Sequence, residues 1–131
     1  RESTDSWAVT PTQVWRAFNN SATNRVSFVR GLDEDAMWGA FNGAASPGTS
    51  GDASIGIVLD SITATPNTIG YIGSATFAFG TISMYASYPG LGYHYLQAME
   101  ASRAGSTNTT FFGDAGIPTY LQSGMQIMGR F

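Results

Sequence analysis

The sequence predicts an all-β protein built from antiparallel strands, arranged as a β-sandwich or a barrel. Short strand-like runs alternate with turn signals about every 8–12 residues, which is typical of both architectures. Glycine accounts for 16 of the 131 residues and aromatic residues for 13% of the chain. This composition favours turns and strands over long helices. The length suits one domain with its own core, and we assign residues 1–131 to it.

The N-terminal region allows two interpretations. Residues 1–6 are polar, and we expect them to fray. Residues 7–18 contain Thr10 followed by Pro11, which could cap a short helix ending at Phe18. The alternative is two short strands interrupted at Pro11. At most one short helix is therefore expected, near the N-terminus.

The middle of the chain contains strand-like runs separated by polar, glycine-rich segments. Residues 75–88 form the longest run, with Phe77 and Phe79 predicted on one face, Ile82 and Met84 on the other, and a bulge or bend at Gly80. The predicted strands are 25–30, 36–41, 54–60, 69–72 and 75–88. The predicted turns and loops are 19–21, 31–35, 42–53 and 61–68.

The C-terminal part, from Tyr88 to Phe131, is predicted to consist of strands joined by turns. Residues 93–104 contain good helix formers followed by Gly105, a possible helix C-cap. We nevertheless predict a strand, because the flanking pattern is all-β and the side chains alternate. A polar loop follows at 103–109, and Gly113–Gly116 is predicted to be a hairpin turn.

The charge and residue usage exclude several classes of function. The basic residues are six arginines with no lysine, and the net charge is −3. The chain therefore has no basic footprint for nucleic acid. It has no cysteine, hence no disulfide or thiolate chemistry. No apolar run is long enough for membrane insertion. The chain begins without methionine or a signal pattern, so we expect a fragment of a longer protein.

Catalytic and metal sites receive little support from the residue pattern. His94 is the single histidine, and zinc sites need several nitrogen or sulfur ligands. Asp33 and Asp35 flank Glu34 in the predicted 31–35 turn, but the spacing of a calcium loop is missing. A glycosidase could pair Glu34 or Glu100 with a second carboxylate. We predict no enzyme activity, no metal and no cofactor.

Aromatic residues offer the best candidates for ligand contact. A flat aromatic face suits the C–H face of a sugar, although aromatic side chains also dominate small β cores. The candidate ligand-binding residues are Trp38, Tyr71, Tyr88 and Tyr93. The loops 42–53, 61–68 and 103–109 would carry specificity, because binding residues concentrate on loops held by a rigid scaffold.

Several segments resemble the C-terminal head domains of fibre and spike proteins in tailed bacteriophages and their prophage relatives. The matching segments are Pro89–Gln97 with Glu100, Thr110–Asp114, Leu121–Met125 and Ile55–Ser61. The resemblance implies an antiparallel, jelly-roll-like β-sandwich at the end of a virion appendage. It also implies a homotrimer that attaches to a bacterial surface polysaccharide or protein. Met125, Ile127, Met128 and Phe131 would then belong to the core or to a threefold seam. A purely structural trimerisation or capsid-decoration domain is the alternative.

Overall fold

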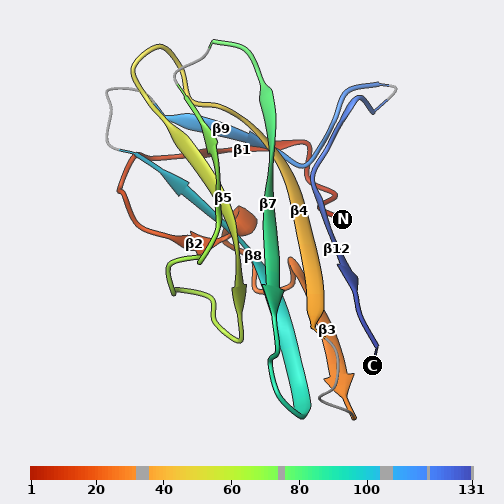
Figure 1. Ribbon diagram of the computed structural model, residues 1–131. Coiled ribbons are helices and arrows are strands. Elements are labelled where there is room, and N and C mark those ends of the chain that lie inside the picture. Colours follow the sequence, from red (N-terminus) through yellow and green to blue (C-terminus); the bar gives the residue numbers. More distant parts are fainter. Residues whose placement is uncertain (32–35, 74–75, 104–107, 118, 131) are drawn as a thin grey trace.

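The computed structural model describes residues 1–31, 36–73, 76–103, 108–117 and 119–130, and it confirms the all-β antiparallel sandwich (Figure 1). One short 3-10 turn, η1 (Phe18–Asn20), is the helical element of this part of the chain. The strands are β1 (Ser6–Val9), β2 (Arg16–Ala17), β3 (Arg25–Arg30), β4 (Met37–Ser46), β5 (Ala53–Leu59), β6 (Ile69–Ile72), β7 (Phe79–Ser87), β8 (Gly92–Ser102), β9 (Thr109–Phe112), β10 (Asp114–Ala115), β11 (Leu121–Gln122) and β12 (Gly124–Met128).

Ten of the strands form two five-stranded sheets with the pairing of a jelly roll, and β10 and β11 form a separate two-stranded sheet. Sheet A contains β1, β9, β4, β12 and β7, and sheet B contains β2, β3, β8, β5 and β6. Four antiparallel pairs are nested along the chain: β1 with β9, β3 with β8, β4 with β7, and β5 with β6. This nesting is what a long hairpin produces when it wraps around a core, and it places successive pairs in opposite sheets.

The core fills the space between the two sheets. Every second residue of a strand faces it, as the two-residue period of a strand requires. Phe18, Phe41 and Phe111 are each at most 1% exposed and contact one another edge to face around Phe18. Aliphatic side chains from both sheets complete the cluster, among them Val9 of sheet A and Ile55, Ile57 and Leu96 of sheet B.

The N-terminal region follows the second interpretation of its sequence. β1 and β2 lie on either side of Pro11, so the predicted helix ending at Phe18 is wrong. Pairing of β1 with β9 and of β2 with β8 supplies backbone hydrogen bonds that a short isolated helix could not match. The first residues are also better anchored than a frayed end, because Glu2 is only 8% exposed.

Two other predictions in the first half are corrected. The predicted loop 42–53 is wrong at both ends, because β4 continues to Ser46 and β5 begins at Ala53. The bulge predicted at Gly80 is also wrong, because the register of β7 with β4 is unbroken from Phe79 to Ser87. The predicted turn 31–35 lies largely outside the described residues.

β8 confirms the strand predicted over 93–104 despite its helix-forming residues. It pairs with β5 on one side and with β2 and β3 on the other. A strand held along both edges satisfies nearly every backbone group, which outweighs local propensity. Further on, the predicted turn Gly113–Gly116 is shifted, because Asp114 and Ala115 form β10 and pair with β11 in a projecting hairpin (Figure 1).

Candidate binding surfaces

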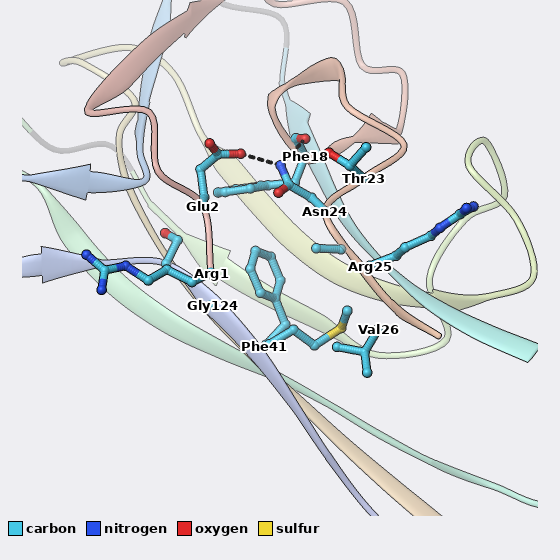
Figure 2. A pocket seen from close by; sticks show the side chains of 12 residues that line it. Arg1, Glu2, Phe18, Thr23, Asn24, Arg25, Val26, Phe41 and Gly124 are labelled. Atoms are coloured by element: carbon cyan, nitrogen blue, oxygen red, sulfur yellow. Dashed lines mark hydrogen bonds between the residues drawn. The ribbon is translucent and has the colours of Figure 1, made fainter. Parts of the chain in front are cut away.

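A small pocket opens between β3 and β12, the facing edges of the two sheets (Figure 2). Its volume is about 50 Å³, which suits a few water molecules or a methyl-sized group but not a sugar ring. Phe18 and Phe41 line it and are almost completely buried. The lining residues are Arg1, Glu2, Phe18, Thr23, Asn24, Arg25, Val26, Phe41, Ala98, Ser123, Gly124 and Met125.

The polar wall of this pocket is already satisfied by the chain itself. The Glu2 carboxylate accepts hydrogen bonds from the backbone N–H groups of Ser3 and Thr4, both at 2.9 Å, and from the Asn24 side chain. Burial raises the pKa of Glu2, but these hydrogen bonds outweigh it and hold the pKa below its usual value. The wall therefore fixes the N-terminal segment and leaves little capacity for a ligand.

Glu100 is a structural carboxylate between the sheets. It is 0% exposed. Trp7 Nε1 donates to its Oε2 at 2.9 Å, and Arg16 Nε donates to its Oε1 at 2.7 Å. Burial raises the pKa of Glu100, and the Arg16 charge and the Trp7 hydrogen bond offset that only in part. A carboxyl group buried in this way cannot reach a glycosidic bond, so Glu100 cannot serve as a catalytic carboxylate of the hydrolase hypothesis.

The other acidic candidates belong to the predicted 31–35 turn. Glu34 and the weak metal candidates Asp33 and Asp35 lie outside the described residues. Within the described ranges, no group of three or more His, Cys, Asp or Glu residues could hold a metal ion.

His94 is a packed histidine. Its Nδ1 lies 2.6 Å from Asp60 Oδ2, and its ring stacks at a tilt on Phe28. Asp60 also accepts the backbone N–H of Tyr95 at 2.8 Å. Asp60 has a φ of 51°, in the left-handed region. The pair therefore holds the chain where it leaves β5.

The four predicted ligand residues are exposed but do not converge. Trp38 is 50% exposed, Tyr71 60%, Tyr88 65% and Tyr93 60%. Trp38 lies on the outer face of sheet A. Tyr71 and Tyr93 lie on the outer face of sheet B, toward opposite ends of it. Tyr88 follows β7. They form no common cleft.

The outer face of sheet A is an uncharged surface that the sequence did not predict. β7, β4 and β12 lie side by side (Figure 1). Their registers place nine positions on this face in three rows. The rows are Ile82–Asn42–Gly124, Met84–Ala40–Gln126 and Ala86–Trp38–Met128. Ile82, Met84, Trp38 and Met128 are 50–72% exposed, and a shallow groove of about 380 Å³ lies at Trp38, Met84 and Met128. We call these nine positions the sheet A face.

The fold and its surfaces define an antiparallel β-sandwich domain with one uncharged, largely apolar sheet face. A scan against protein-family models, a search of curated proteins and a search of solved structures each found no match. None of the described helical segments is long and apolar enough to cross a membrane.

Proposed function

We propose that this chain is a non-enzymatic head domain of a bacteriophage fibre or spike, located on the virion. It assembles as a homotrimer and attaches the particle to a polysaccharide or protein of the bacterial surface. The observation that carries the proposal is the sheet A face. An antiparallel sheet that faces water normally alternates apolar residues inward with polar residues outward. On this face the outward positions are largely apolar as well.

A second copy of the chain is the occupant that best fits the sheet A face. The face has no charge that would select an oppositely charged partner, so a contact with itself or with another uncharged surface of the same chain costs no buried ion. Apolar faces of this kind are covered in obligate assemblies and are aggregation hazards when left open. A head-to-tail contact that repeats around a threefold axis closes into a ring of three copies.

Attachment would use the opposite side of the sandwich. When sheet A is covered, the exposed parts of the outer face of sheet B, which include Tyr71 and Tyr93, and the loops at the ends of the strands remain in contact with solvent. Residues 47–52 connect β4 to β5 and are the part of the specificity loop predicted at 42–53 that lies outside the strands. The second predicted specificity loop, 61–68, lies between β5 and β6.

The mass in solution tests the assembly. We expect three times the chain mass of 13.9 kDa by light scattering during size exclusion. Ile82→Glu and Met84→Glu should reduce the particle to a folded monomer, because each places a charge in the contact. Val29→Glu is the matched control, since Val29 is 62% exposed and Ile82 61%, but Val29 lies on sheet B. A wild-type chain that stays monomeric at every concentration overturns the proposed assembly.

Binding of the labelled domain to bacterial cells separates the two forms of this function. Cell binding that is lost when the 47–52 loop is replaced, with the trimer intact, supports an attachment head. A trimer that binds no host cell favours the purely structural trimerisation or decoration domain, which rests on the same sheet A face.

A further inference from the structure

Tyr71 occupies an open position on the outer face of sheet B. It lies on β6, is 60% exposed, and pairs with Ser54 of β5. Ser54 in turn pairs with Ala101 of β8. The row beside the tyrosine therefore consists of two small side chains. On the other flank, a side chain at Gly73 would contact the Tyr71 ring at 3.6 Å, and glycine leaves that flank open. The ring is therefore largely exposed beside small neighbours.

The hydroxyl end of Tyr71 lies beside a charged pair. Asp52 is close enough to the Tyr71 hydroxyl to raise its pKa. Asp52 Oδ2 accepts a hydrogen bond from Arg103 Nη1 at 2.9 Å, and the Asp52 carbonyl accepts the Arg103 backbone N–H at 3.0 Å. Asp52 therefore positions the guanidinium group, and the register of β6 with β5 places the ring beside it before any ligand arrives.

We infer that Tyr71, Asp52 and Arg103 form a binding platform for a neutral hexopyranoside, which stacks its C–H face on the Tyr71 ring. This inference rests on the proposed attachment function and assigns that function a site. The negative face of an aromatic ring attracts the weakly positive C–H groups of a sugar ring. A sugar needs only one open ring face and adjacent polar groups, and both are present here.

The polar groups of the platform match neighbouring sugar hydroxyls. A carboxylate offers about four acceptor positions and a guanidinium five donors. The side-chain contact between the two uses one acceptor of Asp52 and one donor of Arg103. The Arg103 side chain is 70% exposed, so its remaining donors face solvent. Since the two charges neutralise each other, the platform favours a neutral sugar over an acidic one.

The platform is also compatible with the proposed trimer. It belongs to sheet B, whereas the sheet A face lies on the opposite side of the sandwich. Several copies in one particle would present several platforms to the same polysaccharide. Weak binding at each platform would then become strong overall attachment, because the later contacts are intramolecular.

The test titrates the wild-type chain with methyl β-D-galactopyranoside, methyl β-D-glucopyranoside and methyl α-D-mannopyranoside and follows saturation-transfer difference and amide shifts by NMR. We expect at least one glycoside to bind weakly and to shift the amides around Tyr71 and Asp52. Tyr71→Ala should weaken binding roughly ten-fold. Tyr71→Phe, which keeps the ring, should retain most of the affinity. Asp52→Asn should weaken binding while the fold, followed by thermal unfolding, is kept.

Tyr93→Ala is the matched control, because Tyr93 has the same exposure and its hydroxyl donates to Ser27 without a charged pair. The platform is wrong if no glycoside binds, or if Tyr93→Ala abolishes binding and Tyr71→Ala does not. If either of these results is obtained but the trimer still binds host cells, the attachment function stands and its site lies elsewhere. A monomer that binds no cells, but still binds a glycoside at Tyr71, refutes the attachment function and keeps the platform.

Discussion

Replacing Arg16 with methionine should make the stability of this domain strongly dependent on pH. Arg16 donates to the buried carboxylate of Glu100, and its charge is the largest effect that opposes the burial of that group. Breaking a buried ion pair costs about 3–5 kcal/mol. The Arg16 side chain is 35% exposed, so we expect the lower end, about 3 kcal/mol at pH 7, or roughly 10 °C in Tm.

The sign of the pH dependence follows from Glu100. The folded-state pKa of Glu100 is raised. Glu100 therefore contributes favourably to the free energy of unfolding below its unfolded-state pKa, and this contribution is lost as the pH rises through the folded-state pKa. Arg16→Met raises that pKa further. The loss of stability should therefore be large at pH 7 and shrink to under about 1 kcal/mol near pH 4, where the carboxyl is neutral.

Urea unfolding at pH 4 and pH 7, at one fixed protein concentration, measures both values. Arg25→Met is the matched control, because the Arg25 guanidinium lies 4.7 Å from the centre of the Tyr95 ring and pairs with no buried carboxylate among the described residues. Arg25→Met should cost about 1 kcal/mol or less at both pH values. An equal loss for Arg16→Met at the two pH values would refute the assigned role of the Glu100 charge.

Two further substitutions test the packing and the anchoring of the chain. Gly56→Ala should destabilise the domain by about 2 kcal/mol, measured by thermal unfolding, because its Cβ would lie 2.2 Å from Cγ of the rigid Pro66 ring. Glu2→Gln should cost about 1.5 kcal/mol at pH 7 and little at pH 3 in urea unfolding. The pKa of Glu2 is lowered, so its contribution is present above the usual pKa and is lost as pH falls; a loss that persists at pH 3 would contradict this reasoning.

Strands with regular alternation or a continuous apolar run could be predicted from the sequence. β3, β5 and β6 lie within one residue of their predicted ranges, because turn residues bound them on both sides. β8 required an argument from context, since its local propensity is helical. That argument succeeded because its neighbours are strands whose edges need a partner.

The loop predicted at 42–53 shows why composition can mislead. Asn42–Ser46 has the small residues of a loop, but in the sheet small size serves packing. A side chain at Gly43 would approach Ile55 of the opposite sheet at 3.1 Å, so the glycine allows the two sheets to approach. No local signal distinguishes a glycine that permits close packing from one that permits a turn.

The candidate surfaces depend on register, which the sequence could not supply. Tyr71 was predicted as a contact residue from its type alone. Its partners Asp52 and Arg103 come from two other segments and meet it only through the pairing of β5 with β6 and β8. Single exposed aromatic residues can be guessed from a sequence, but the groups beside them require the fold.

In β7 the polarity of the side chains does not match the side of the sheet on which they lie. Both Ile82 and Met84 point to solvent, whereas Ser83 between them is 2% exposed and donates to the Thr68 carbonyl at 2.9 Å. A one-residue shift of register would bury the two apolar side chains and expose the serine. The strand keeps the inverted register, because Tyr85 must face the core and Ser83 has its partner. An inverted strand without another surface to cover it would be a liability in water, which is the main support for the proposed contact of the sheet A face with a second copy of the chain.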